Sequence, residues 1–274
     1  MTYSNYDLIL TMGHFVTGHE GVDGSGLPIL HTALSGSPPS QTSPDVEEHC
    51  RRFRVTGGGQ SHAAYHFLAK DTLDGGAFLD TPNTTAIEMI FSARLETGDI
   101  AKFQHGGCGV LCRNINYGFF DNAGASESSY GYGLRLSTCA NMSISEIAPH
   151  VGLYARESST NHDEVIVSSL PVLGTVLIDT WYTLKLEVVP SGNIQDLLTA
   201  YVLTGTDIDD DNDWTQVSQL TINNIDPGYI SWNSPSQRMG FYAQRASKSN
   251  FSSQDDQKYY PHMDYVRIRL KTMP

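Results

Sequence analysis

Short segments that alternate apolar and polar residues dominate the sequence from about residue 50 onward. In 86–96 (AIEMIFSARLE), every second residue from Ile87 to Leu95 is apolar, and Glu88 and Arg94 occupy positions between them. Successive side chains of a strand point to opposite faces of the sheet. The pattern therefore predicts a strand with one face in the core and the other face turned away from it.

The same alternation recurs in 182–188 and 266–270, with Gly, Asn, Asp and Ser between the segments and no long stretch of helical spacing. Many antiparallel strands without helices are typical of a sandwich or barrel. We therefore predict an all-β fold, an antiparallel jelly-roll sandwich of two sheets over residues 46–274. Gly, Ser, Pro and Thr crowd 13–44, so residues 1–45 are predicted to form an irregular N-terminal arm that docks on another subunit or decorates the domain edge.

The composition bounds the class of protein. A chain of 274 residues with 39% hydrophobic residues can build a sizeable core. It carries 30 acidic against 17 basic residues, a formal charge of -13, and no run of Lys and Arg, so nucleic acid is not an expected partner. The N-terminal MTYSNYDLILTMGHF has no basic leader and no segment approaches about 18 apolar residues, which predicts neither a standard export signal nor a membrane span.

The four cysteines match no zinc signature, because the Cys108-x-x-x-Cys112 pair has no second pair of ligands behind it. With Cys50 and Cys139 they are predicted to be mainly reduced core thiols, although the spacing leaves a disulfide or a metal site open.

Two segments resemble each other, VGLYARE at 151–157 and MGFYAQR at 239–245. Alternation places the pair Tyr154 and Arg156, and the corresponding pair Tyr242 and Gln244, on the face opposite the core residues between them. One interpretation is an amphipathic sheet surface. The other is a ligand-binding patch for a sugar, in which an aromatic ring stacks on the pyranose while amide or guanidinium groups bind its hydroxyls.

The β segments follow one another in a recognisable order: FRVTGGG (53–59), AIEMIFSARLE (86–96), YGLRLS (132–137), HVGLYARE (150–157), DTWYTLKLEVVPSG (179–192), LTAYVLTG (198–205), RMGFYAQR (238–245) and MDYVRIRL (263–270). This order resembles the concanavalin A-like jelly rolls, a group that includes laminin-G-like modules, legume-type lectins, glucanases and alginate lyases. The resemblance covers most of the chain and implies the fold. Because the group contains binders and enzymes alike, it does not decide the activity.

The glucanases of this group share an E-x-D-x-x-E strand motif, which this sequence lacks. Glu88 and Glu96 would lie about 26 Å apart along a strand, too far for the paired carboxylates of glycoside hydrolysis. Retaining hydrolysis is therefore not expected.

Resemblance to the jelly-roll alginate lyases implies an Arg and a Gln that neutralise a uronate carboxylate, and a His and a Tyr that handle protons during β-elimination. The rough equivalents here are Arg94, Gln104, His105 and Tyr242. The match departs from the family, because Gln104 and His105 are adjacent and the Arg-Ser-Glu-x-Arg signature is absent.

The stretch 206–214 (TDIDDDNDW) lies between two alternating segments and is predicted to form the tip of a hairpin. Its acidic spacing resembles a calcium loop, but the Gly and the bidentate Glu of a helix-flanked loop are missing. Two interpretations stay open. The tip is a solvated turn, or Asp207, Asp209 and Asp211 share one calcium ion at the rim of the sandwich.

Together these observations favour a non-enzymatic jelly-roll binding or structural protein that requires no cofactor. We expect a phage virion component, such as a head decoration, fibre or tail-associated protein, made in the host cytoplasm without a signal peptide. A non-standard secretion route would explain the same sequence. Its expected partners are a glycan or neighbouring virion subunits, in a homo-oligomer or larger assembly. The alternative is a polysaccharide lyase acting by β-elimination on uronate polymers.

Overall fold

The computed structural model describes residues 8–11, 21–22, 28–33, 41–45, 50–54, 62–68, 85–95, 105–114, 131–137, 149–156, 162–167, 169–170, 174–191, 195–223, 238–246 and 261–272. These residues form strands and one short 3-10 turn, with no α-helix among them: β1 (Leu8–Thr11), β2 (Gly21–Val22), β3 (Pro28–Ala33), β4 (Gln41–Asp45), β5 (Cys50–Arg54), β6 (His62–Leu68), β7 (Thr85–Leu95), β8 (His105–Asn114), β9 (Gly131–Ser137), β10 (His150–Arg156), β11 (His162–Val167), β12 (Ser169–Leu170), β13 (Gly174–Thr175), β14 (Tyr182–Ser191), β15 (Gln195–Leu203), the turn η4 (Asp211–Asp213), β16 (Trp214–Asn223), β17 (Arg238–Ala246) and β18 (Pro261–Thr272).

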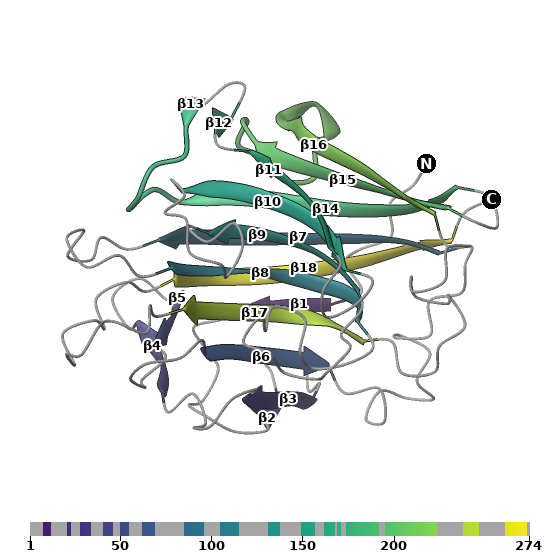
Figure 1. Cartoon of the computed structure of the whole chain (residues 1–274). Helices are drawn as coiled ribbons and strands as arrows, with labels where there is room; N and C mark the ends of the chain where they lie inside the picture. The colour runs from purple at the N-terminus through teal and green to yellow at the C-terminus, as the bar shows by residue number, and fades with distance from the viewer. Residues whose placement is uncertain are drawn as a thin grey trace.

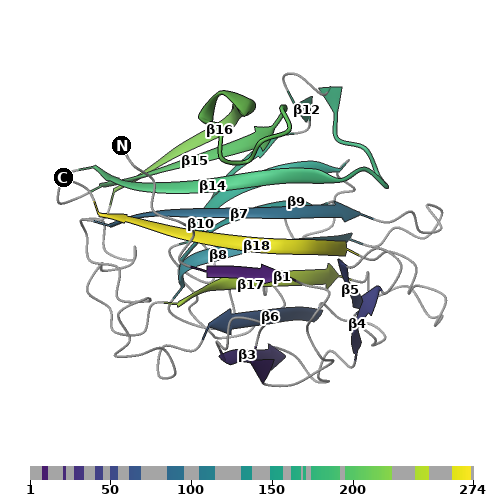
Figure 2. The same ribbon diagram turned by 180° about the vertical axis from the view of Figure 1, so that it is seen from behind.

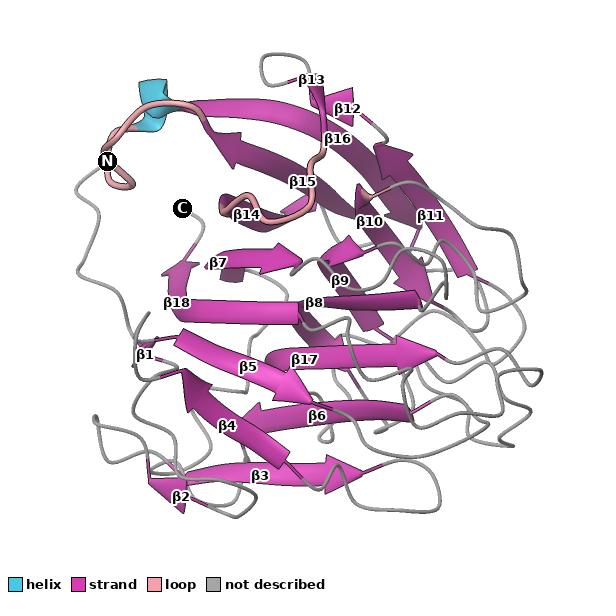
Figure 3. Ribbon diagram, turned by 90° about the vertical axis from the view of Figure 1, so that its left-hand side faces the viewer, coloured by secondary structure: helices cyan, strands magenta, loops and turns pink. Residues whose placement is uncertain are grey.

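Two antiparallel sheets of eight strands each pack face to face (Figure 3). Sheet A has the order β16-β15-β14-β7-β18-β5-β4, with β1 also paired to β18, and is nearest the viewer in Figure 2. Sheet B has the order β11-β10-β9-β8-β17-β6-β3-β2 and is nearest the viewer in Figure 1. The strands β12 and β13 form a separate pair. The prediction of an all-β, two-sheet antiparallel sandwich is confirmed.

The core lies between the sheets and follows the alternation seen in the sequence. On β7 the alternate residues from Ile87 to Leu95 all belong to the core cluster, and the strand packs against β8 and β9, which contribute Val110 and Leu134 to the same cluster. The prediction for β7 is thus confirmed. Its other face is also covered, since Glu88 is only 3% exposed. We call the face of each sheet that points away from the other sheet its outer face.

Residues 1–45, predicted as an irregular arm, are described only in part. Where this segment is described it forms β1 to β4, which pair with β18 and β5 in sheet A and with β6 in sheet B. Their two to six residues are too short to give a readable alternation. The strands β2 and β4 also lie at sheet edges, where Pro44 on β4 is tolerated because an edge strand leaves some N–H positions unpaired.

A β-bulge interrupts the pairing of β15 with β16. Ala200 pairs with Ser218, whereas the next residue, Tyr201, pairs with Gln216, so that Val217 is an extra residue on β16. Val217 packs against the core. The bulge therefore changes which residues of β16 face inward, as bulges do generally.

Polar groups also connect the two sheets through the core. The Tyr132 hydroxyl on β9 donates a 2.9 Å hydrogen bond to Asp196 Oδ2 on β15, and both side chains are buried. Cys108 Sγ lies 3.6 Å from the carbonyl oxygen of His262 on β18. Cys108 and Cys112 are buried free thiols, as predicted for these two positions, and burial raises the pKa of the Cys108 thiol far above its ordinary value. No helix in the described ranges is long and apolar enough to span a membrane.

Candidate functional site

The two Tyr-containing segments lie in one sheet, as β10 and β17 of sheet B. The position of Tyr154 on β10 pairs with Gly133 on β9, which pairs with Leu111 on β8. The position of Tyr242 on β17 pairs with Gly109 on β8. Because Leu111 and Gly109 are two residues apart on one strand, the two Tyr positions lie on the same face, and this is the outer face of sheet B.

The polar partners extend this arrangement into a diagonal across four strands. The Gln244 position pairs with Gly107 on β8, and the Arg156 position pairs with Gly131 on β9. From Gln244 to Arg156 the diagonal spans about 20 Å along the strands and about 14 Å across them. We call the positions of Tyr154, Arg156, Tyr242 and Gln244 the diagonal of sheet B.

Glycines occupy much of the outer face between the ends of the diagonal. At Gly109 a Cβ would lie 2.1 Å from the carbonyl oxygen of Leu134 and 2.8 Å from the Cα of Arg135, so the close approach of β8 and β9 requires glycine there. The other residues of this face that are described include Leu111, Arg135 and His150, which are at most 5% exposed. The centre of this face is therefore sheltered from solvent rather than open.

The residues of the lyase alternative are not brought together. Arg94 lies on β7 in sheet A, and its guanidinium packs 5.3 Å from the ring centroid of Trp181. His105 and Tyr242 lie on neighbouring strands of sheet B, at positions of the same face. Gln104 lies outside the described residues. Arg94 and Tyr242 lie in different sheets, so a catalytic site that used both would have to reach across the sandwich. The sequence did not reveal this, because alternation does not show which sheet a strand joins.

The acidic stretch is the tip of the β15–β16 hairpin, as predicted, and its carboxylates hold the loop together. Asp213 Oδ2 accepts 2.8 Å hydrogen bonds from the backbone N–H groups of Thr206 and Asp207. Asp207 in turn accepts from the N–H of Asp209 at 2.9 Å, and Asp210 caps η4 by accepting from Asn212 N. Side chains that accept bonds from nearby N–H groups in this way are typical of Asx turns.

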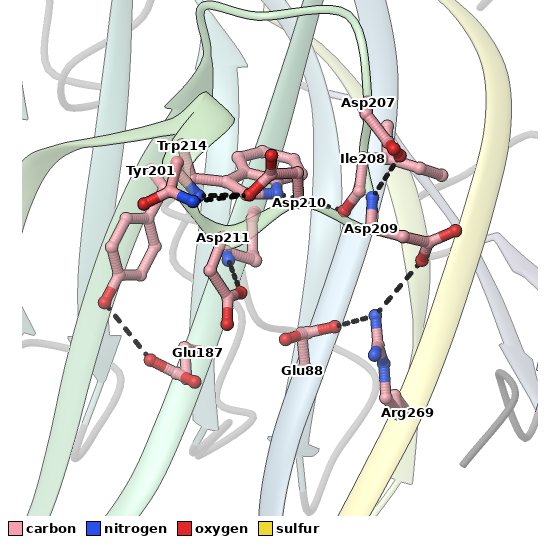
Figure 4. Close-up of polar contacts among 12 residues, drawn as sticks. Glu88, Glu187, Tyr201, Asp207, Ile208, Asp209, Asp210, Asp211, Trp214 and Arg269 are labelled. Carbon is pink, nitrogen blue, oxygen red and sulfur yellow. Dashed lines mark hydrogen bonds and ion pairs between the residues drawn. The ribbon is translucent and has the colours of Figure 1, made fainter. Parts of the chain in front are cut away.

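The tip folds back over the outer face of sheet A (Figure 3). There it meets a charged cluster, part of which is drawn in Figure 4. We define the charged cluster as the side chains of Glu88, Glu187, Lys185, Arg269 and Lys271. Its ion pairs join β7 to β18 and β18 to β14: Arg269 Nη2 to Glu88 Oε1 at 2.9 Å, Lys271 Nζ to Glu88 Oε2 at 3.1 Å, and Lys271 Nζ to Glu187 Oε1 at 3.7 Å. The contact at Glu88 Oε1 is not aligned as a hydrogen bond, so charge attraction dominates it.

Two aspartates of the tip add to the cluster from above. Asp209 Oδ1 lies 3.7 Å from Arg269 Nη2, and Asp211 Oδ1 lies 4.0 Å from Lys185 Nζ. The tip is fixed in this position by Trp214, whose indole N–H donates to the carbonyl of Ile208 at 3.1 Å. The acidic tip thus neutralises basic groups of sheet A in a protein that is acidic overall.

Burial and charge act in opposite directions on the amine of Lys185. Its ammonium lies 4.5 Å from the ring centroid of Trp214 and 4.6 Å from that of Tyr201. Burial lowers the pKa of Lys185, and the carboxylates of Glu88, Glu187 and Asp211 partly offset the decrease. Burial, with the added charge of Glu187, raises the pKa of Tyr201 to about 12.

The three aspartates proposed as calcium ligands have separate partners. Asp207 bonds within the loop, Asp209 contacts Arg269 and Asp211 contacts Lys185. Over the part of the chain that is described, no three His, Cys, Asp or Glu side chains gather as a metal site would require. Calcium binding at the tip stays a prediction, and it would require these carboxylates to leave their present partners.

The charged cluster was not predicted. Its signal in the sequence is the set of charged residues at outward positions of three strands, Glu88 in 86–96, Lys185 and Glu187 in 182–188, and Arg269 in 266–270. The alternation places each of them on the face of its strand that is turned away from the core. Only the pairing of β7 with both β14 and β18 shows that the opposite charges meet.

The architecture can be compared with known proteins. No protein-family model and no curated protein sequence matches the chain. Among solved structures, it is similar to the lectin UEA-II complexed with galactose, at 10% identity and a TM-score of 0.50 over 97% of this chain and 100% of that one. It is also similar to basic winged bean lectin with Tn-antigen, at 11% identity and a TM-score of 0.51 over 96% and 98%.

A third similar structure is an enzyme. A mutant of the alginate lyase Aly36B in complex with an alginate tetrasaccharide matches at 9% identity and a TM-score of 0.51, over 97% of this chain and 98% of that chain. Likeness at such low identity concerns the fold alone. By its two sheets, its strand order and these matches, the chain has the concanavalin A-like jelly-roll fold.

Proposed function

We propose that this protein is a non-enzymatic, lectin-like carbohydrate-binding protein whose ligand lies along the diagonal of sheet B. The observation that carries the proposal is the register, which brings Tyr154, Arg156, Tyr242 and Gln244 to one face of one sheet. Two aromatic rings and two polar groups of this kind suit a sugar, whose C–H face stacks on a ring while its hydroxyls need hydrogen-bond partners.

The spacing favours an oligosaccharide over a single sugar. The two Tyr positions are separated by β8 and β9, about 14 Å across the sheet, so one pyranose cannot contact both. Because Leu111, Arg135 and His150 between them are at most 5% exposed, the oligosaccharide would reach the two Tyr positions from outside this covered centre. That two structurally similar proteins are lectins, one complexed with galactose, supports the same class of ligand.

β-Elimination on uronate polymers is the alternative function, supported by the similarity to an alginate lyase. Against it stands the position of Arg94, which the family resemblance made the carboxylate-binding group but which lies in sheet A. Arg94 is therefore not placed to neutralise a uronate carboxylate held at His105 and Tyr242, a role that removal of the α-proton requires.

A binding screen and a turnover assay on the same preparation separate the two functions. We expect oligosaccharides from a glycan array to bind, with affinity reduced at least about tenfold in Tyr154→Ala and in Tyr242→Ala. Gln216→Ala serves as the matched control, because Gln216 is exposed on β16 of the other sheet. Accumulation of ultraviolet-absorbing unsaturated product from alginate, abolished by Tyr242→Phe, would refute the non-enzymatic proposal.

The virion location predicted from the sequence is a separate hypothesis, to which the fold adds nothing. Mass spectrometry of purified phage particles tests it, and absence of the protein from the particles would overturn it.

A further inference from the structure

The turn between β13 and β14 exposes two large apolar side chains. Leu177 is 56% exposed and Trp181 is 36% exposed, the large hydrophobic residues in the described ranges that are most open to water. Asp179 is exposed between them, whereas Val176 and Tyr182 at the two ends of the turn belong to the core. The turn therefore projects Leu177, Asp179 and Trp181 to solvent from a firmly buried base.

The exposure comes from a fixed backbone. The N–H of Asp179 donates a 2.7 Å hydrogen bond to the carbonyl of Leu95 at the end of β7, and the N–H of Leu177 donates to the Tyr182 hydroxyl at 2.9 Å. Figure 2 shows the start of β14 and the tip of β7 at the same end of the sandwich. Asp179 has a φ of 60°, a left-handed conformation that costs about 1 to 2 kcal/mol for a residue with a Cβ. Such conformations persist where the surroundings impose them, commonly at ligand sites.

The indole of Trp181 is held in place by its neighbours on sheet A. The Arg94 guanidinium lies 5.3 Å from the ring centroid, and the His262 imidazole meets the ring edge at 6.5 Å with an interplanar angle of 86°. A cation against an aromatic ring and an edge-to-face ring pair are both attractive. Since Trp181 remains 36% exposed, it offers a rigid aromatic surface to a ligand, with little conformational entropy left to lose on binding.

The size of the patch argues for a small ligand. The exposed parts of Trp181 and Leu177 together offer about 200 Å² of surface, from the area that such side chains bury when fully covered. A stable protein interface needs about 800 Å² on each partner, so the patch is too small for protein docking but matches one sugar ring. Asp179 supplies a carboxylate that accepts hydrogen bonds from hydroxyls. This carboxylate and the net charge of -13 disfavour an anionic sugar.

We propose that Leu177, Asp179 and Trp181 form a second carbohydrate site, separate from the diagonal of sheet B, which takes a neutral hexopyranose. The apolar C–H face of the sugar stacks on Trp181 and contacts Leu177, and its hydroxyls bond to Asp179. The site does not depend on the diagonal, because it lies at the end of sheet A.

NMR on the ¹⁵N-labelled whole chain tests this site directly. The three tryptophans give three indole N–H signals, and Trp181→Phe assigns the one that belongs to residue 181. The probes are the methyl glycosides of galactose, glucose and mannose, with free glucuronate as the anionic comparison. We expect at least one neutral glycoside to shift the Trp181 signal and to leave the buried Trp214 signal unchanged.

Two variants and one control complete the experiment. Leu177→Ser changes an exposed side chain and should leave the fold intact. It is expected to lower the affinity for the glycoside, measured by titrating the Trp181 signal, at least about tenfold. In Trp181→Ala, which lacks that signal, we expect no transfer of magnetic saturation from the protein to the sugar. Tyr242→Ala should leave both signals as in the parent, so loss of the diagonal is distinguishable from loss of this site. The proposal is overturned if no neutral glycoside shifts the signal, if Leu177→Ser binds as tightly as the parent, or if the signal moves with protein concentration alone, which would indicate self-association.

Discussion

Replacing Glu88 with Gln tests whether the charged cluster stabilises the sandwich. Glu88 is 3% exposed and its two oxygens lie 2.9 Å from Arg269 and 3.1 Å from Lys271. The substitution keeps the shape of the side chain and removes its charge. Arg269, itself 6% exposed, would then stay buried opposite a neutral amide.

The expected loss follows from the surroundings of the two cations. Breaking a buried ion pair by removing one partner costs about 3 to 5 kcal/mol, because the remaining charge is left without compensation. Here the lower end applies. Asp209 stays 3.7 Å from Arg269 and Glu187 stays 3.7 Å from Lys271, and the Lys271 side chain is 23% exposed. We expect the free energy of unfolding to fall by about 3 kcal/mol.

Urea unfolding at neutral pH measures this loss, with an unchanged m-value as evidence that the folded state is preserved. Glu187→Gln is the matched control, since Glu187 lies directly opposite Glu88 on the neighbouring strand but is only half-buried. We expect it to lower the free energy of unfolding by less than about 1 kcal/mol. Combining Glu88→Gln with Arg269→Met should recover most of the loss, because both members of the pair are then uncharged. A loss below about 1 kcal/mol for Glu88→Gln, or strict additivity in the double variant, would refute the reasoning.

Three further perturbations address other parts of the fold. Gly205→Ala places a Cβ about 2 Å from the Asp213 carboxylate, so it should displace that group and raise amide hydrogen exchange in the hairpin tip, at a stability loss of about 1 to 2 kcal/mol; unchanged exchange would contradict the role of Asp213. Tyr132→Phe removes the donor to buried Asp196 and should cost about 1 to 3 kcal/mol in denaturant unfolding, a prediction that fails if the midpoint is unaltered. Because the pKa of Tyr201 is raised from 10.0 to about 12, the folded state favours the neutral phenol, and the unfolded state loses its proton first as the pH rises. The parent should therefore lose more stability than Tyr201→Phe between pH 10 and about 12. Plots of the free energy of unfolding against pH that run parallel for the two proteins would contradict this prediction.

The strands with long, regular alternation could be predicted from the sequence because period two depends only on local geometry. The apolar positions of β7 and β14, such as Phe91 and Leu184, occupy the core as expected. The N-terminal strands could not be predicted, since pairs such as β1 with β18 join residues from opposite ends of the chain. Their pairing depends on tertiary contacts that leave little mark on a short segment.

The candidate sites, like the strands, could be predicted from the sequence only in part. That Tyr154 and Tyr242 share a face followed from alternation once both strands were placed in one sheet. That Arg94 belongs to the other sheet did not follow, because alternation gives the face of a strand but not its sheet. The partners of Asp209 and Asp211 were equally hidden, since they depend on the direction in which the hairpin tip folds.

The additional residue Val217 exchanges the two faces of β16, so that residues before the bulge point to the side opposite the one that regular alternation would give. Counting back from the core residue Ile222 in steps of two would place Trp214 in the core, whereas the bulge turns it to the outer face against Lys185. An ungapped alignment of this strand with a regular one will therefore assign either Trp214 or Ile222 to the wrong side. In a relative that lacks one residue here, the position of Trp214 would face the core and should carry an apolar side chain. That relative should lose the anchor of the acidic tip. A one-residue gap in an alignment would therefore separate otherwise similar chains whose outer surfaces differ.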